Sequence, residues 1–171
     1  MQNQTTKYMV NKARDREMKK DVSITAGDVK IRKILSEDFK ALVEFGTALM
    51  DSRLSIDIWR AYLQSYINPY FPPVSQLAEV TGKIIGAALG EIKGWELGSP
   101  LVGWVNAIAV LPDFRSKGIA KKLLLEFVDE CRRAGVRSVH MIAPKEDDVR
   151  QALLRSVGFR RGSFVDFEIK S

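Results

Sequence analysis

The pattern of hydrophobic and polar residues predicts strands and helices in regular succession from residue 29 onward. Apolar and basic residues alternate over 29–32, which is the period of a strand. Apolar residues spaced three and four apart predict helices over about 36–50, 56–66, 118–134 and 148–157. Two β-prone runs on either side of Thr81-Gly82 predict a hairpin, and further strands are predicted at 102–110, 136–144 and 164–169.

The predicted strand 102–110 is largely apolar on both faces, which is typical of a sheet covered by helices on both sides. Strict alternation places Val102, Trp104, Asn106, Ile108 and Val110 on one face and Val105, Ala107 and Ala109 on the other. Gly46 lies within the apolar stripe of the first helix, where a missing side chain lets a neighbouring element pack closely. The element order predicts an α/β fold, a mixed sheet with helices on both faces.

Length and composition indicate one compact domain with a charged N-terminal extension. The chain has 171 residues, of which 46% are hydrophobic and 28% charged, as in soluble globular proteins. Residues 1–27 are polar and charge-dense, so we expect a flexible arm there and a folded domain over 28–171. No apolar run approaches the roughly 20 residues of a membrane span, and no apolar core of the signal-peptide kind is present near residue 1.

Cysteine and histidine are too few for a disulfide or a metal centre. Cys131 is the single cysteine and His140 the single histidine, so an internal disulfide is excluded and no zinc site is expected. These features favour a reducing cytoplasm. The net charge of +6 fits a nucleic acid, an acidic membrane or a phosphorylated cofactor, and it equally fits a solvated basic surface.

The stretch VLPDFRSKGIAKKLL, residues 110–124, combines features of an anion site at the start of a helix. The first turn of a helix presents unpaired N–H groups and a partial positive charge. Gly118 would let an anion approach the backbone, and Arg115, Lys117 and Lys121 add full charges nearby. A pyrophosphate across this turn is one interpretation, and a charged loop before an ordinary helix is the other.

The same stretch resembles the coenzyme A motif of the GNAT superfamily of N-acetyltransferases. That motif is Arg or Gln, two residues, Gly, one residue, then Gly or Ala, and here it reads Arg115-Ser116-Lys117-Gly118-Ile119-Ala120. IRKILSEDFKALVEF resembles the first strand and helix of the family, AEVTGKIIGAAL its hairpin, and VRQALLRSVGF its last helix with the Gly158-Phe159 exit. The similarity covers about Val29 to Phe159.

The resemblance implies a fold, a cofactor and a reaction. The fold would be a single GNAT-like domain in which the fourth and fifth strands splay apart, and the cofactor would be acetyl-CoA. Main-chain groups of Ile108, Ala109 and Val110 would hold the pantetheine arm and the thioester carbonyl. The N–H groups of Arg115, Ser116, Lys117, Gly118, Ile119 and Ala120, with Lys121 nearby, would hold the pyrophosphate. A primary amine, on a small molecule or a protein, would attack the thioester directly in a ternary complex.

The sequence departs from the family pattern at two catalytic positions, Leu154 and Trp104, and at one cofactor contact, Asp147. Leu154 stands where many members have a tyrosine that acts as the acid and reprotonates the leaving thiolate. Trp104 stands where histone-type members have a catalytic glutamate, and Asp147 where many members have an asparagine. The catalytic residues are therefore unknown. The substitutes we consider are His140, Glu79, Glu91, Tyr62, Tyr66 and Tyr70, each of which also has a purely structural interpretation. Cys131 lies in an apolar stripe and is interpreted as packing.

Two other functions fit some of the same features. A non-catalytic acyl-CoA-binding sensor fits the missing tyrosine and glutamate. A nucleic-acid-binding module fits the basic charge but lacks a recognition motif, so it ranks last. One clear strand follows Phe159, where many relatives have two, and a second copy of the chain could complete the edge as a homodimer.

Overall fold

The computed structural model describes residues 28–49, 55–67, 72–94, 100–162 and 169. The predicted arm over 1–27, most of the last predicted strand and the candidate Tyr70 lie outside these residues. The strands are β1 (Lys30–Lys33), β2 (Gln76–Val80), β3 (Lys83–Lys93), β4 (Val102–Val110) and β5 (Val139–Met141). The helices are α2 (Phe39–Leu49), α3 (Ile56–Ile67), α4 (Ile119–Arg133) and α5 (Asp148–Val157), and 3₁₀ turns occupy Ser36–Asp38 and Pro112–Phe114.

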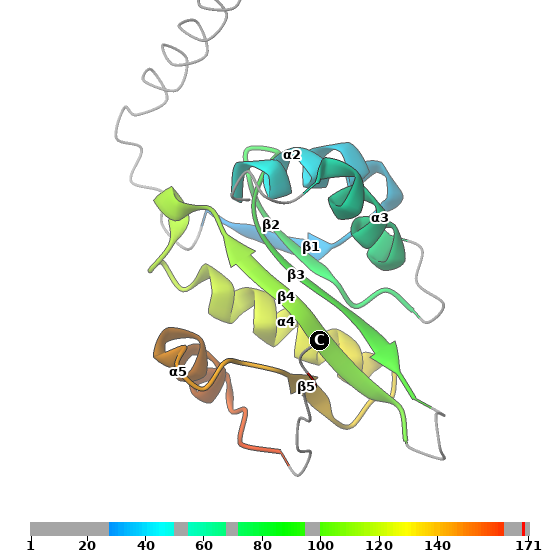
Figure 1. The fold of residues 1–171 in the computed structure, drawn as a ribbon, viewed down its shortest axis with the longest axis vertical. Helices are drawn as coiled ribbons and strands as arrows, with labels where there is room; N and C mark the ends of the chain where they lie inside the picture. Colours follow the sequence, from blue (N-terminus) through cyan, green and yellow to red (C-terminus); the bar gives the residue numbers. More distant parts are fainter. Residues whose placement is uncertain (1–27, 50–54, 68–71, 95–99, 163–168, 170–171) are drawn as a thin grey trace, which may run out of the picture.

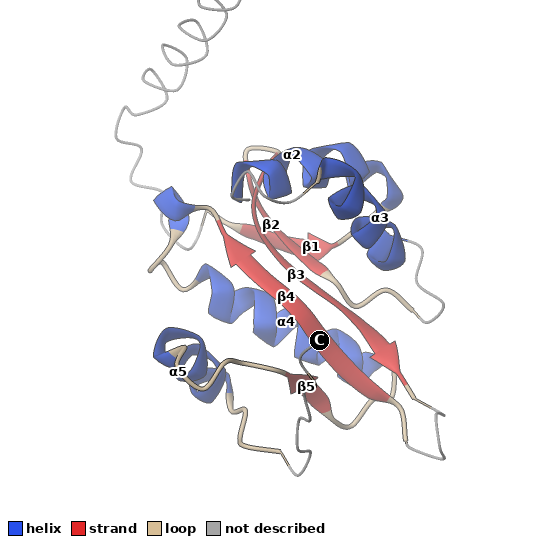
Figure 2. Ribbon diagram, in the orientation of Figure 1, coloured by secondary structure: helices blue, strands red, loops and turns tan. Residues whose placement is uncertain are grey.

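The described strands form one mixed sheet in the order β1-β2-β3-β4-β5. β1 to β4 pair antiparallel, and β5 pairs parallel to β4 after the crossover through α4. Helices α2 and α3 lie on one face of the sheet, and α4 and α5 lie on the other (Figures 1 and 2). The predicted mixed sheet covered on both faces is confirmed.

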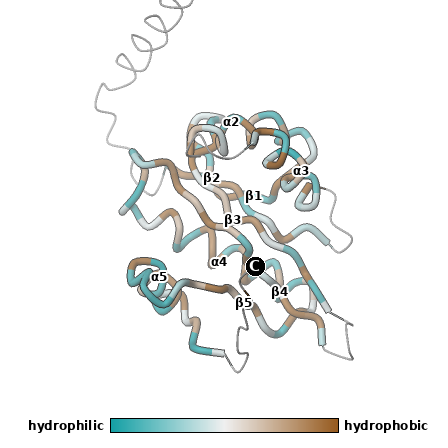
Figure 3. The backbone as a smooth tube through the Cα atoms, in the orientation of Figure 1, coloured by the Kyte–Doolittle hydropathy of each residue, from teal (hydrophilic) through white to brown (hydrophobic). Residues whose placement is uncertain are grey.

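Two separate cores account for this layering. Leu77, Ala87 and Leu89 pack against α2 and α3, while Ala78, Ile85 and Ala88 pack against α4. Neighbours such as Leu77 and Ala78, or Ala87 and Ala88, thus serve opposite faces, and a register shift between β2 and β3 reverses the alternation at Ile85. Brown, hydrophobic residues run along much of the central strands, whereas α5 is mostly teal (Figure 3), which agrees with a sheet buried between outer helices.

The hairpin between β2 and β3 has the predicted turn. Thr81 and Gly82 both have positive φ angles, 48° and 79°, which is the backbone of a two-residue type I′ turn. This turn matches the right-handed twist of the paired strands.

A bulge in β4 changes which residues share a face. Leu89 pairs with Ala107, but its neighbour Gly90 pairs with Val105, so Asn106 is an extra residue without a partner on β3. Before the bulge, Val105 is buried against α4, whereas Asn106 contacts α3. The strict alternation predicted for 102–110 is therefore wrong, because Trp104 and Asn106 lie on the face opposite to Ile108 and Val110.

Gly90, on the strand opposite the bulge, must be a glycine. A Cβ atom there would lie 2.2 Å from the carbonyl oxygen of Trp104 and 2.6 Å from the Phe127 ring. The Ser75 hydroxyl accepts a hydrogen bond from the Gly90 N–H at 3.0 Å and lies 2.9 Å from the Gly90 carbonyl, to which it can donate. The close approach and the hydroxyl bridge hold the bulged register in place.

A buried ion-pair network joins β1, β2 and the turn before α2. The Arg32 guanidinium donates to both oxygens of Asp38, at 2.6 and 2.7 Å, and to Glu79 at 2.8 Å. Asp38 also accepts the Leu35 N–H at 2.8 Å, so its side chain caps the 3₁₀ turn at Ser36–Asp38. Burial alone would raise the pKa of Asp38, but the hydrogen bonds from Arg32 and Leu35 outweigh it and lower the pKa.

Gly46 provides the close helix packing that its position predicts. A Cβ atom at Gly46 would lie 2.1 Å from the indole nitrogen of Trp59 on α3. That nitrogen donates to the Leu42 carbonyl at 3.3 Å, which fixes the ring across α2.

We expect Gly46→Ala to lower the free energy of unfolding by about 1–2 kcal/mol in urea denaturation. The overpacking cost against Trp59, about 1–3 kcal/mol, exceeds the gain of roughly 0.5–1 kcal/mol from helix propensity. Gly162→Ala is the matched control, because a Cβ there meets no atom within 4 Å. A stabilised Gly46→Ala variant would contradict this packing.

Candidate active site

The connection from β4 to α4 leaves the start of the helix open to an anion. We call residues 115–121 the α4 entry. Gly118 is the N-cap with φ 75°, and it has no side chain with which to cap the helix. The first hydrogen bond of the helix runs from the Lys122 N–H to the Gly118 carbonyl at 3.1 Å. The N–H groups of Ile119, Ala120 and Lys121 therefore have no carbonyl within the helix to which they can donate.

The space and charge around the α4 entry suit a phosphate. A Cβ atom on Gly118 would meet no atom within 4 Å, so the backbone can be approached from outside. Ser116 also has a positive φ of 60°, which turns the chain sharply before the helix. Arg115, Lys117 and Lys121 are exposed, and their charges add to the positive end of the helix dipole.

The second half of β4 has an open edge. β5 pairs with β4 only from Gly103 to Val105, and residues 106–110 have no partner on that side within the part of the chain that the structure describes. Leu111 donates to the Ile85 carbonyl on the β3 side at 2.9 Å. By strand alternation, the main-chain groups of Ala109 also face β3, and those of Ile108 and Val110 face the open edge.

One hydrogen bond joins the open edge to the α4 entry. Arg115 Nε donates to the Val110 carbonyl at 3.0 Å, so the guanidinium lies against the end of β4. The Val110 N–H and both main-chain groups of Ile108 remain directed to the open edge. The open edge of β4 at Ile108 and Val110 is therefore adjacent to the α4 entry, whereas the main chain of the predicted Ala109 faces β3.

The comparisons with known proteins decide the family. The model of the Acetyltransferase (GNAT) family matches residues 30–159. The chain belongs to the GNAT family. It is an acetyltransferase, and acetyl-CoA is its acetyl donor. The resemblance that the motif at Arg115–Ala120 indicated is confirmed, and so is the splay of β4 from β5.

Solved structures of similar fold support this assignment. The aminoglycoside N-acetyltransferase AAC(6')-Iy is 23% identical, with a TM-score of 0.70 over 84% of this chain and 98% of its own. The aminoglycoside acetyltransferase meta-AAC0020, from an uncultured soil metagenomic sample, is 20% identical, with a TM-score of 0.69 over 85% and 97%. A ribosomal-protein-alanine N-acetyltransferase from Brucella melitensis is 19% identical, with a TM-score of 0.63 over 84% and 99%. No curated protein sequence matches the chain.

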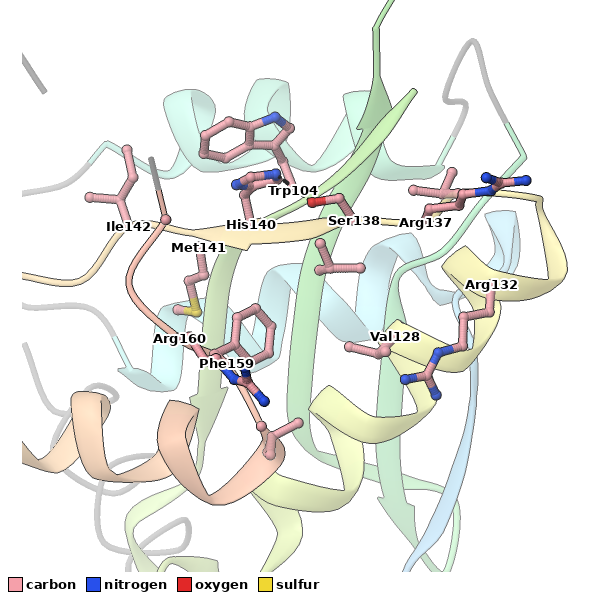
Figure 4. A pocket seen from close by; sticks show the side chains of 15 residues that line it. Trp104, Val128, Arg132, Arg137, Ser138, His140, Met141, Ile142, Phe159 and Arg160 are labelled. Atoms are coloured by element: carbon pink, nitrogen blue, oxygen red, sulfur yellow. Dashed lines mark hydrogen bonds between the residues drawn. The ribbon is translucent and has the colours of Figure 1, made fainter. Parts of the chain in front are cut away.

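At its catalytic positions this GNAT protein has no acid or base of the usual kind. Leu154 is a core residue with 8% of its surface exposed, packed in the same cluster as Leu124 of α4. Trp104 stacks on His140 of β5, with ring centroids 5.1 Å apart (Figure 4). Asp147 caps α5 by accepting the Arg150 N–H at 2.9 Å.

The structure assigns packing or structural contacts to most of the substitute candidates. His140 is hydrogen-bonded to the Ser138 hydroxyl at 2.7 Å and stacked on Trp104, and Glu79 is held by Arg32. Cys131 is fully buried, and burial raises the pKa of its thiol to about 11, which confirms its packing role.

One tyrosine candidate, Tyr66, is linked to Glu91 through Asn106 at the β4 bulge, and sequence patterns missed this arrangement. Asn106 Nδ2 donates to the Tyr66 hydroxyl at 2.9 Å and to Glu91 Oε1 at 3.1 Å. Tyr66 is buried, and burial is the main reason that its pKa lies well above the usual value, so the hydroxyl stays protonated. We call Tyr66, Glu91 and Asn106 the bulge cluster. A polar residue within the apolar strand 102–110 was its one sequence signal.

A hollow beside β5 is separate from the α4 entry. Trp104, His140, Ile142, Phe159 and the basic Arg132, Arg137 and Arg160 are among the residues that line it (Figure 4). None of residues 115–121 lines this hollow. Within the described residues, no helix is long and apolar enough to span a bilayer, and no group of metal-binding side chains is gathered.

Proposed function

We propose that this protein moves the acetyl group of acetyl-CoA to a primary amine, on a small molecule or a protein, by direct attack in a ternary complex. The observation that carries the proposal is the junction of the open β4 edge with the uncapped start of α4, joined through Arg115 and Val110. An extended thioester arm and a pyrophosphate fit such a junction, since one needs main-chain partners and the other needs N–H donors.

Each part of the junction has its own task in this proposal. The Arg115 N–H already donates to the Pro112 carbonyl at 3.2 Å, so the pyrophosphate would lie against the N–H groups of 116–120, with Lys121 adding charge. The pantetheine arm pairs with the main chain of Ile108 and Val110, whereas Ala109, whose main chain faces β3, shapes the strand between them. The Val110 N–H then points toward the thioester carbonyl, where it stabilises the negative charge that develops on the oxygen during attack.

The proton balance follows from the residues present. The acceptor ammonium loses one proton before attack and the amine loses one afterwards; the departing thiolate gains one proton, and the other passes to solvent water. Because Leu154 cannot donate a proton, the thiolate receives its proton from water or from another group in the cleft. Holding the amine and the thioester together supplies a large part of the rate enhancement.

The similar structures support a class of acceptor, a primary amine, and not a particular acceptor molecule. AAC(6')-Iy and meta-AAC0020 act on aminoglycosides, which are small polyamines, and the Brucella enzyme is named for a protein alanine. At 19–23% identity these proteins share the fold with this chain. A primary amine is the acceptor class that they have in common.

The lack of the usual proton-transfer groups at Leu154 and Trp104 also fits an acyl-CoA sensor, and the family assignment favours the enzyme over this second candidate. A cytoplasmic location and a homodimer that pairs the outer edge of β5 also stay proposals. The cytoplasmic location is supported by Cys131, which is the single cysteine of the chain and is buried. The homodimer is supported by the outer edge of β5, beyond which no strand lies among the described residues.

We expect Gly118→Leu to abolish coenzyme A binding. A side chain at Gly118 would occupy the space where the pyrophosphate approaches the backbone. Coenzyme A at 100 times its Kd should raise the melting temperature of the wild type by roughly 5–10 °C. The shift should be lost in the variant.

Gly135→Leu is the matched control for this experiment. Gly135 lies just beyond the other end of α4, has a similar φ of 81° and also has no atom within 4 Å of a Cβ. Both variants therefore carry the same backbone strain, about 1–2 kcal/mol. An equal ligand response in the two variants would refute the phosphate assignment.

We expect the wild type to release thiol from acetyl-CoA when it is mixed with a suitable primary amine. Sisomicin, spermidine and a tripeptide with a free N-terminal alanine represent the acceptor types, and a thiol-reactive dye measures the product. Substoichiometric release with every amine, despite a normal thermal shift with coenzyme A, would favour the sensor.

A further inference from the structure

The bulge cluster lies on the α3 side of the sheet, beside the open edge of β4. Asn106 is two residues before Ile108, about 7 Å along the strand. Glu91 pairs directly with Trp104 across β3 and β4, so both side chains lie on the same face as Asn106. The cluster therefore lies next to the place where the thioester is proposed to lie.

Hydrogen bonds fix the orientation of the Asn106 amide. A carboxylate can only accept, so the group directed at Glu91 must be the NH₂ group, and Nδ2 supplies one hydrogen to Glu91 and one to Tyr66. Tyr66 is buried on α3 and holds the amide against the strand. No donor within the part of the chain that the structure describes contacts the amide oxygen Oδ1.

Glu91 has one carboxylate oxygen available for an incoming donor. Asn106 Nδ2 and Lys93 Nζ both contact Oε1, each at 3.1 Å. No donor within the described residues contacts Oε2, and the Glu91 side chain is 32% exposed. Lys93 shows that the position accepts an alkylammonium group.

We propose that Glu91 binds the ammonium form of the acceptor amine and that Asn106 is a positioning residue for its carboxylate. The inference rests on the proposed function and names the acceptor subsite of that reaction. A primary alkylamine is largely protonated at neutral pH. Its ammonium group donates to Glu91 Oε2, the carboxylate oxygen that Asn106 and Lys93 leave available, with the Trp104 ring as an apolar wall. Neutral and anionic acceptors gain nothing from this site.

Glu91→Gln tests the charge with little change of shape. We expect the variant to raise the KM of the turned-over amine at least tenfold, to change kcat less than threefold and to leave the coenzyme A thermal shift intact. Lys93→Met should lower the same KM, because it removes an internal competitor for the carboxylate. Glu126→Gln, on α4 with an ion pair to Arg133 at 3.7 Å, is the matched control.

A double-mutant cycle tests the role of Asn106. If Asn106 acts through Glu91, Asn106→Ala raises the amine KM in the wild type and has no further effect in the Glu91→Gln background. Additive effects of the two substitutions would overturn the positioning role.

Calorimetric titration of sisomicin, spermidine and the alanine tripeptide separates this inference from the proposed function. The titrations use the protein with and without saturating coenzyme A. Weaker amine binding by Glu91→Gln with normal coenzyme A binding supports the inference. Equal amine binding by Glu91→Gln and the wild type, or no amine binding by the wild type, overturns it while the cofactor site stands. Loss of the coenzyme A response in the wild type defeats the proposed function, and the amine titrations of the free protein still decide on Glu91.

Discussion

The one-residue bulge at Asn106 is the constraint on which the rest of the site depends. Before the bulge, β4 pairs with β3 and β5 and places Val105 against α4. After it, the alternation is reversed, pairing with β5 has ended, and the main chain of Ile108 and Val110 faces the open edge. The extra residue is also the one that contacts Tyr66 and Glu91. One insertion thus redirects both the strand faces and a polar side chain.

The bulge is stable because its neighbours leave room and supply partners. Gly90 permits the backbone approach of Trp104, and the Ser75 hydroxyl satisfies both main-chain groups of Gly90. A buried amide group without a partner costs about 1–3 kcal/mol, so this hydroxyl offsets a real penalty. The segment of β4 that diverges from β5 and the α4 entry come next along the chain. The hydrogen bond from Arg115 to the Val110 carbonyl joins them.

Local patterns predicted most of the elements, since each depends on residues close in sequence. The I′ turn at Thr81-Gly82, the close packing at Gly46 and the open helix start at Gly118 were all visible in the sequence, because a glycine signals its own conformational need. The bulge could not be predicted from the sequence, because it depends on how β3 and β4 pair, and the pattern of residues within β4 alone does not determine that pairing. For the same reason Glu91 was one candidate among several until the register placed it opposite Trp104.

The two ends of the open β4 edge carry opposite charge, which determines how a charged ligand can lie along it. The α4 entry carries Arg115, Lys117 and Lys121 beside N–H donors, and the bulge cluster offers acceptors, the Glu91 carboxylate and the Asn106 amide oxygen. In the proposed complex, a diphosphate and an ammonium group therefore bind at opposite ends of one strand segment, and the thioester bond that must be broken lies between them. Because Leu154 and Trp104 supply no proton-transfer group, this sorting and the resulting proximity are the catalytic means that the described residues provide.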